Sequence, residues 1–234
     1  MKKFLPVAFL LIALSIATAC AAEDPGATNA PATLNHDDSI YFPRLDFYNM
    51  TSTETGRIIL THYPTFQQET EYSCGAAAAR SVLKYFGRNA FDEPALIEAL
   101  KTKPHTGTSL GNMVKFFQRL GWQVQSSLDA KPFNDEFAFQ RFVAENLERG
   151  VPILVENVEW GGHWRVIIGL DTLNTAELYD DVLIFAEPYD TSDHAQDGYT
   201  FGSLDRFYWM WFDHSVLPKR ERNQPWLIAT PRRS

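Results

Sequence analysis

The stretch "QQETEYSCGAAAARSVLKYFG", which runs from Gln67 to Gly87, decides the fold because a cysteine stands where a helix is expected to begin. Ser73 can serve as the N-cap of a helix that continues to Phe86. The run of four alanines has high helix propensity and lets neighbouring elements pack closely. Cys74 therefore falls in the first turn, where free amides and the helix dipole stabilise a thiolate.

Two neighbours of Cys74 fit a reactive thiol. Gly75 costs a helix about 1 kcal/mol relative to alanine, so its place in the first turn predicts open access for a substrate or another chain. Gln68 lies six residues before Cys74. Its side-chain amide can direct a donor at an oxyanion beside the thiol, together with the backbone N–H of Cys74.

The N-terminal segment "MKKFLPVAFLLIALSIATAC" is typical of a secretory signal. Lys2 and Lys3 form a positive n-region, and the apolar stretch that follows is short for a membrane span. The small residues before Cys20 fit a plain cleavage site, and together with Cys20 they resemble a bacterial lipobox. We predict a signal peptide over 1–19 and lipidation of Cys20, with plain secretion as the alternative. The protein would then be exported to the periplasm or cell envelope and anchored by its lipid.

Cysteine usage narrows the role of Cys74, because Cys20 and Cys74 are the chain's two cysteines. Two thiols are too few for a structural zinc site built from several thiolates. With Cys20 lipidated, Cys74 has no partner for a disulfide within the chain. A lone thiol in an oxidising compartment is a liability unless it is buried or used. Cys74 is therefore either a core cysteine or a nucleophile.

Composition indicates one globular domain, which we place at residues 39–234, since 45% of the residues are hydrophobic and 14% aromatic. Residues 20–38 are small and polar without periodicity, as in a flexible tether. Once Lys2 and Lys3 leave with the signal, 19 basic residues remain against 29 acidic ones, a net charge of −10. This charge argues against nucleic-acid binding. It also leaves the acyl chain as the expected link to the membrane.

Helical patterns come first and strand patterns later, which predicts an α+β fold with an antiparallel sheet. The helical segments begin with "SCGAAAARSVLKYF" and end with 133–149. The strand-like segments are "VPILVENV", "HWRVIIGLD", "DDVLIFAEP" and "PWLIAT", the last of which we predict as an edge strand. The aromatic segment 201–213 is expected to pack a helix over the sheet.

A thiol nucleophile needs a base, and "EWGGHWRVIIGLD" places His163 at the start of an apolar strand. Its imidazole can accept the proton of Cys74 and form a thiolate–imidazolium pair. A third group should orient the imidazole, and "FAEPYD" offers Glu187 and Asp190 at the end of the next strand. The acidic loop "YDTSDHAQDGY" fits neither a calcium nor a zinc pattern, so we predict no metal site there.

Taken in order, "QETEYSCGAAAA", "GGHWRVIIGLD" and an acid followed by Pro188 resemble the papain-like family of bacteriocin-processing cysteine peptidases, which act on double-glycine leaders. The resemblance covers residues 63–190. It implies a papain-like fold, with a nucleophile helix in an N-terminal helical half packed on an antiparallel sheet. It also implies that Gln68 belongs to the oxyanion hole, that Cys74 is the nucleophile and that His163 is the base. Glu187 stands where the family has Asp, so this chain departs from the pattern there and Asp190 stays an alternative.

The resemblance implies an exported thiol-dependent peptidase that cleaves a peptide or amide bond through an acyl-enzyme on Cys74. Its partner is a peptide or protein substrate, and no cofactor or metal is expected. Phytochelatin synthase resembles this family, so a transpeptidase or amidase acting on a small thiol peptide is the first alternative. A non-catalytic envelope binding domain on the same scaffold is the second. An enzyme needs Cys74 within hydrogen-bond reach of His163, whereas a binding domain does not.

Overall fold

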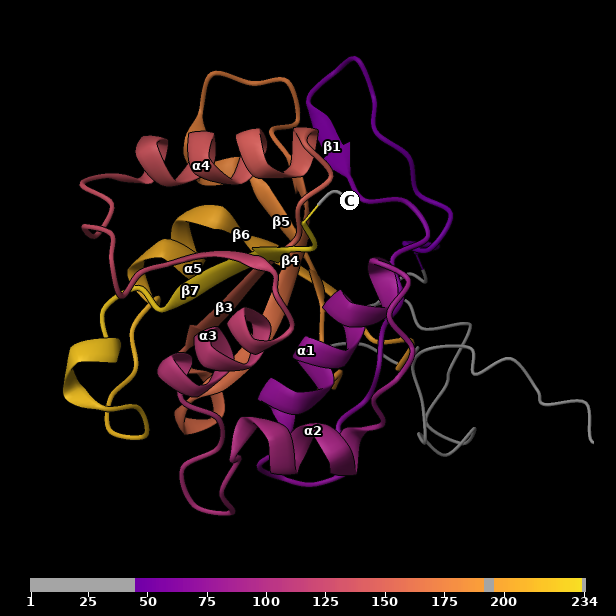
Figure 1. Cartoon of the computed structure of the whole chain (residues 1–234). Helices are drawn as coiled ribbons and strands as arrows, with labels where there is room; N and C mark the ends of the chain where they lie inside the picture. Colours follow the sequence, from indigo (N-terminus) through magenta and orange to yellow (C-terminus); the bar gives the residue numbers. More distant parts are fainter. Residues whose placement is uncertain (1–44, 192–195, 233–234) are drawn as a thin grey trace, which may run out of the picture.

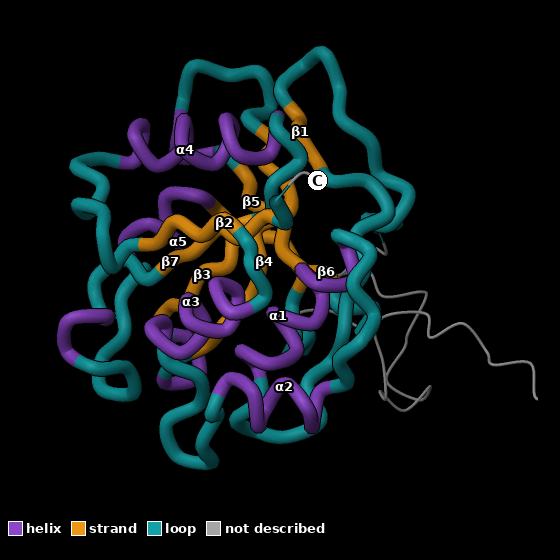
Figure 2. Tube along the Cα trace, viewed as in Figure 1, coloured by secondary structure: helices purple, strands orange, loops and turns teal. Residues whose placement is uncertain are grey.

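The computed structural model describes residues 45–191 and 196–232, and within these ranges seven strands form one sheet in the order β2-β7-β3-β4-β5-β6, with β1 paired to β4 (Figures 1 and 2). Every pair of neighbours is antiparallel. The strands are β1 (Arg57–Ile59), β2 (Gln123–Ser126), β3 (Ile153–Asn157), β4 (His163–Asp171), β5 (Val182–Ala186), β6 (Tyr199–Ser203) and β7 (Trp226–Thr230).

The helices are α1 (Cys74–Tyr85), α2 (Glu93–Leu100), α3 (Leu110–Arg119), α4 (Glu136–Glu148) and α5 (Leu204–Trp209), with short 3-10 turns η2 (Glu159–Gly161), η3 (Leu178–Asp180) and η4 (Lys219–Glu221). The predicted α+β fold, with a helical half and the cysteine helix on an antiparallel sheet, is confirmed. No helix in the ranges 45–191 and 196–232 combines the length and hydropathy that a membrane span needs.

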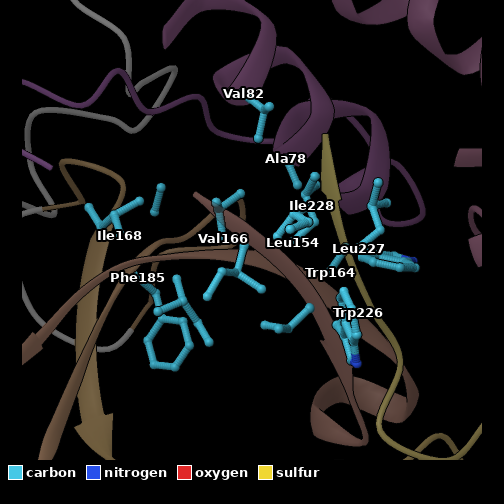
Figure 3. Close-up of a cluster of buried hydrophobic side chains, with 14 of the residues drawn as sticks. Ala78, Val82, Leu154, Trp164, Val166, Ile168, Phe185, Trp226, Leu227 and Ile228 are labelled. Atoms are coloured by element: carbon cyan, nitrogen blue, oxygen red, sulfur yellow. The ribbon is translucent and has the colours of Figure 1, made fainter. Parts of the chain in front are cut away.

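The alternating side chains of β4 face two helical layers. Figure 3 shows Val166 and Ile168 near Ala78 and Val82 of α1. The intervening residues of β4 face the aromatic side of the sheet, where the ring centroids of Phe185 and Phe207 in α5 lie 5.5 Å apart. Because β4 is buried on both faces, its central run "VIIGL", residues 166–170, is continuously apolar. The strand therefore carries the core while its first residue reaches the site.

One local prediction was wrong, and another holds for the position of the residue but not for its side-chain bond. The segment "PWLIAT" is not an edge strand, because β7 lies between β2 and β3 and is buried along most of its length. Ser73 stands before α1, but its side chain makes no capping bond to the helix. Its Oγ instead accepts from the backbone N–H of Thr70 at 3.0 Å and so closes the loop ahead of the helix.

The role of Gly75 also differs from the prediction, which was open access to the first turn of the helix. A Cβ on this buried glycine would lie 2.7 Å from Thr108 and 3.2 Å from the ring of Trp164. The missing side chain therefore lets the first turn of α1 pack against its own sheet and the loop before α3. It does not open the turn to a substrate. This close packing fixes where the N-terminus of α1 meets β4.

Candidate active site

Cys74 is the first residue of α1 and lies against the start of β4. The thiol is free and buried. Its Sγ accepts a hydrogen bond from the backbone N–H of Trp164 at 3.5 Å. The fold thus joins the helix start and the strand start, which lie 90 residues apart in the sequence.

His163 and Glu187 form a buried side-chain pair beside this thiol. The Nε2 atom of His163 contacts Oε1 of Glu187. The thiol of Cys74 also interacts with the imidazole and helps to raise its pKa. His163 opens β4 and Glu187 directly follows β5, and these strands are antiparallel neighbours with Val166 opposite Ala186. Their register therefore places the carboxylate beside the imidazole.

The pair is charged at neutral pH. Burial by itself would lower the pKa of His163, but the charge of Glu187 and the hydrogen bonds to Cys74 and Glu187 raise it from 6.5 to about 10. Burial would raise the pKa of Glu187, but His163 and then Arg165 lower it below its usual value of 4.5. An imidazolium and a carboxylate therefore coexist in a site with little solvent.

Arg165 supports Glu187 from the side away from His163. Its Nη1 lies 3.5 Å from Oε2 of Glu187, and its Nη2 lies 2.8 Å from Oε2 of Glu159. The guanidinium carbon sits 4.3 Å from the ring centre of Phe185. The backbone N–H of Tyr189 donates to Oε1 of Glu187 at 3.0 Å. Both oxygens of Glu187 are therefore held, although sequence reasoning missed Arg165. An arginine inside an apolar strand was the available signal, because buried charges need partners.

Asp190, the alternative acid, has another partner. It is fully buried, and its Oδ2 accepts from the backbone N–H of Gly198 at 3.0 Å, between β5 and β6. The structure thus brings Glu187, and not Asp190, into contact with His163. Of the other acidic-loop residues considered from the sequence, Asp193 and His194 lie outside the described residues. Within the described ranges, no group of three or more His, Cys, Asp or Glu residues is arranged to hold a metal ion.

Gln68 lies in the loop that leads into α1. Its Nε2 donates to the carbonyl of Thr70 at 2.7 Å, and its backbone N–H donates to the carbonyl of Pro188 at 2.8 Å. The next residue, Glu69, donates its N–H to Oε1 of the fully buried Glu93 at 2.8 Å. Burial raises the pKa of Glu93. The loop is therefore fixed at three points beside Cys74 and Glu187.

A second acid pair, also missed from the sequence, lies under the turn that precedes His163. Glu156 and Asp213 are both buried. Burial and then the nearby Asp213 raise the pKa of Glu156 to about 10. A Cβ on Gly162 would lie 3.0 Å from Oε1 of Glu156 and from Oδ2 of Asp213. Glu156 in the middle of the apolar segment "VPILVENV" was a readable signal of such a pair.

This fold and this arrangement of cysteine, histidine and carboxylate define a papain-like cysteine peptidase. Residues 58–203 match the family model described as papain-like cysteine protease AvrRpt2. The match spans more than half of the chain, so the chain belongs to this family of papain-like cysteine proteases. The predicted class is confirmed.

Solved structures of double-glycine peptidase domains resemble the chain at low identity. The peptidase domain of Streptococcus ComA, a bifunctional ABC transporter of a quorum-sensing pathway, is 20% identical with a TM-score of 0.49, over 73% of this chain and 100% of that one. A double glycine motif protease from an AMS/PCAT transporter, solved with a leader peptide, is 13% identical with a TM-score of 0.43, over 77% and 97%. A comparison with curated proteins finds no match.

Proposed function

We propose that the chain is a thiol peptidase that cleaves a peptide or amide bond through an acyl-enzyme on Cys74. The observation that carries this proposal is the contact series from Cys74 to His163 to Glu187, in which the pKa of the imidazole is raised and that of the carboxylate is lowered. This is the pattern of a nucleophile, a base and an orienting group. The family match supports the same reaction class.

In the first half-reaction, the thiolate of Cys74 attacks the substrate carbonyl carbon and the carbonyl π electrons move to its oxygen. The tetrahedral intermediate collapses as the C–N bond breaks, and the imidazolium of His163 gives its proton to the departing amine. A thioester on Cys74 remains. In the second half-reaction, His163 takes a proton from water, and the resulting hydroxide attacks the thioester carbon. The C–S bond then breaks, which releases a carboxylic acid and the Cys74 thiolate and restores the thiolate–imidazolium pair. Glu187 stays ionised and holds the imidazole throughout.

The oxyanion is assigned to the side-chain amide of Gln68 and the backbone N–H of Cys74. The Gln68 amide uses one N–H for Thr70 and keeps a second for the substrate. The bonds from the loop to Pro188 and Glu93 support this assignment, because they fix the loop before a substrate arrives.

We propose further that the protein is exported and anchored by a lipid on Cys20, with the tether 20–38 leading to the catalytic domain. The apolar segment behind Lys2 and Lys3 and the small residues before Cys20 support this placement. The signal 1–19, Cys20 and the tether all lie outside the described residues. Metabolic labelling of the full chain with a fatty acid, with Cys20→Ser as control, tests it.

The interaction of Cys74 with His163, which raises the pKa of the imidazole, favours an enzyme over a non-catalytic binding domain. The test of function is digestion of a peptide library by the full chain, read by mass spectrometry, with Cys74→Ala as control. Cleavage that Cys74→Ala abolishes supports the peptidase. Products that carry an added amine or small thiol peptide in place of water would identify the transpeptidase alternative. If neither kind of product forms, the enzymatic proposal is overturned.

A further inference from the structure

Two buried carboxyl groups that the proposed reaction does not use lie beneath the turn that leads into β4. Glu156 in β3 is 1% exposed, and Asp213, in the segment between α5 and β7, is 4% exposed. A Cβ on Gly162 would lie 3.0 Å from Oε1 of Glu156 and 3.0 Å from Oδ2 of Asp213. The turn therefore rests on both acids at the residue directly before His163.

The two acids are served very unequally by hydrogen-bond donors. Oδ1 of Asp213 accepts from the backbone N–H of Leu217 at 2.9 Å and lies 3.5 Å from Nε of Arg222. Oδ2 of Asp213 and both carboxyl oxygens of Glu156 are buried and have no hydrogen-bond partner within the described part of the chain. Two buried carboxylates this close do not both stay ionised, so one proton lies between them. Because the donors serve Asp213, the proton belongs to Glu156 and points to Oδ2 of Asp213.

The charged and titratable groups that face Glu156 come from α1, from β4 and from the segment after α5. Burial and then the charge of Asp213 raise the pKa of Glu156 to about 10. The charge of Cys74 raises this pKa further, while the backbone N–H of His163 acts in the opposite direction. Because such coupling is reciprocal, an ionised Glu156 would oppose the thiolate of Cys74. A neutral Glu156 therefore favours the charged form of the nucleophile.

Glu156 also neighbours the part of β4 that contacts the thiol. In the register of β3 with β4, Glu156 is opposite Trp164 and Asn157 is opposite His163. Side chains at opposite positions of antiparallel strands share one face of the sheet and contact each other. The backbone N–H of Trp164 donates to Sγ of Cys74 at 3.5 Å. The acid therefore supports the start of β4, which carries both the base and a donor to the nucleophile.

Asp213 connects the same turn to a separate loop. Its backbone N–H donates to the carbonyl of Arg222 at 2.8 Å, and the guanidinium of Arg222 donates to three backbone carbonyls within the loop. Val216 of this loop would lie 3.3 Å from a Cβ on Gly162. A proton between Glu156 and Asp213 therefore joins β3 and this loop beneath the turn.

We propose that Glu156 and Asp213 are a positioning pair for the peptidase, in which one shared proton holds the turn before His163 and keeps a second negative charge away from the Cys74 thiolate. The proposal rests on the proposed function and adds an alkaline limit to it. When hydroxide removes the proton from Glu156, water forms and a carboxylate remains. Its charge repels Asp213 and opposes the thiolate, so activity falls.

The first experiment measures kcat/KM from about pH 6 to pH 11 for a peptide that the full chain cleaves. His163 also loses its proton at the alkaline end, at about 10, so variants must separate the two groups. In Asp213→Asn the neighbouring charge is gone and the amide can donate to Glu156. We expect the alkaline limb to move to lower pH by about one unit or more. Adding Glu156→Gln should return the limb to its wild-type position, because glutamine has no proton to lose.

Asp181→Asn is the matched control for this experiment. Asp181 is another buried acid, and its Oδ2 accepts from Gln140 at 2.6 Å. It directly precedes β5, whereas Glu187 follows the other end of that strand, so Asp181→Asn should leave the limb in place. An alkaline limb that Asp213→Asn does not move overturns the proposal. A limb that stays shifted in the double variant belongs to His163 and also overturns it, while cleavage itself still supports the peptidase.

The second experiment reads the pair without catalysis. Carbon NMR follows the side-chain carboxyl of Glu156 in glutamate-labelled full-length protein, and Glu156→Gln assigns the signal. We expect a titration midpoint near 10 in the wild type. The midpoint should be lower in Asp213→Asn and in Cys74→Ser, which removes the thiolate charge at nearly constant size.

This titration separates failure of the proposal from failure of the peptidase function. If both variants lower the midpoint while the peptide library is not cleaved, the peptidase function fails and the link between the acid pair and Cys74 stands. A wild-type midpoint near the ordinary value of 4.5 overturns the proposal, because the pair then holds no proton. A midpoint that Cys74→Ser leaves unchanged overturns it as well, because the pair then does not act on the nucleophile.

Discussion

The backbone N–H of Gln68 donates a hydrogen bond of 2.8 Å to the carbonyl of Pro188, the residue that follows Glu187. This bond joins the loop ahead of the nucleophile helix to the strand end that carries the orienting carboxylate. Cys74, His163 and Glu187 lie on separate elements, and these elements are therefore linked through the backbone as well as through side chains. A site tied in this way keeps its geometry without a bound substrate, which electrostatic catalysis requires.

Glu187→Gln should lower kcat/KM by about 10²- to 10⁴-fold. The amide keeps the shape of the side chain but loses the charge that raises the pKa of His163 to about 10. The imidazolium should then be lost near neutral pH, where the wild-type ring stays protonated. NMR titration of the His163 ring nitrogens measures this directly. An unchanged ring titration would show that Glu187 does not set the charge of His163.

The same variant changes how stability depends on pH. The raised pKa of His163 stabilises the fold fully below the usual pKa of 6.5, and this contribution is lost as the pH rises through about 10. The lowered pKa of Glu187 stabilises the fold above 4.5 and is lost as the pH falls through its folded value. The gap in unfolding free energy between wild type and Glu187→Gln should therefore be widest between these limits, near pH 5 to 6.5, and narrow toward pH 10. Urea titrations at several pH values give this gap.

Arg165→Met should shift the acidic limb of the kcat/KM profile to higher pH. Arg165 helps to lower the pKa of Glu187, so the carboxylate should protonate earlier when the guanidinium is removed. Methionine keeps much of the packing against Phe185. Arg206→Met is the matched control, because Arg206 is an exposed arginine of α5, whereas Arg165 is paired with Glu187. Equal profiles for the two variants would contradict a positioning role for Arg165.

Glu156→Gln should stabilise the protein at pH 8 and have less effect near pH 4. The pKa of Glu156 is raised to about 10 in the fold, so folding takes up a proton at every pH between 4.5 and that value. Its contribution is favourable below 4.5 and is progressively lost as the pH rises, by the sign of proton linkage. Glutamine needs no proton and can still pair with Asp213. A pH-independent difference would show that Glu156 is ionised in the folded protein.

Gly162→Ala should destabilise the fold by about 1–3 kcal/mol. The glycine has a φ of 140°, and an added Cβ would lie 3.0 Å from oxygens of both Glu156 and Asp213. Gly87→Ala is the control, because Gly87 also has a positive φ, 73°, but meets nothing within 4 Å of an added Cβ. The excess loss in Gly162→Ala measures the contact with the acid pair, and thermal melts of both variants compare them. Equal losses would mean that the positive φ alone, and not the contact with the acid pair, accounts for the glycine at position 162.

The sequence was sufficient for the groups whose positions follow from local structure. A cysteine at a helix start and a histidine at a strand start are local signals, and the fold brings Cys74 and His163 together. The choice between Glu187 and Asp190 was not local, because it depends on the register of β4 with β5, which shifts between Ile167 and Gly169. That register, together with the turn bond of Asp190 to Gly198, decides which acid reaches the imidazole.

Other features depended on packing between distant segments. Gly75 is tight against Thr108 and Trp164, which no pattern around the cysteine could reveal. The hydroxyl of Ser73 bonds to Thr70 in the loop and not to the first turn of the helix. Both partners are within reach of the same short side chain, so the sequence does not show which one it takes. Arg165 and Glu156 could have been noticed as charges in apolar strands, but their partners Glu159 and Asp213 are known only from the fold.

The most direct test of the central claim is the alkylation rate of Cys74 by iodoacetamide across pH 5 to 9, measured by intact mass on the full chain and on His163→Ala. A thiolate–imidazolium pair predicts that the wild-type rate at pH 6 stays within a few-fold of the rate at pH 8, and that His163→Ala slows alkylation most at the acidic end. An isolated thiol reacts roughly tenfold more slowly for each unit of pH below its own titration. If the wild type follows that steep course and matches His163→Ala, the nucleophile and base are not paired and the account is wrong.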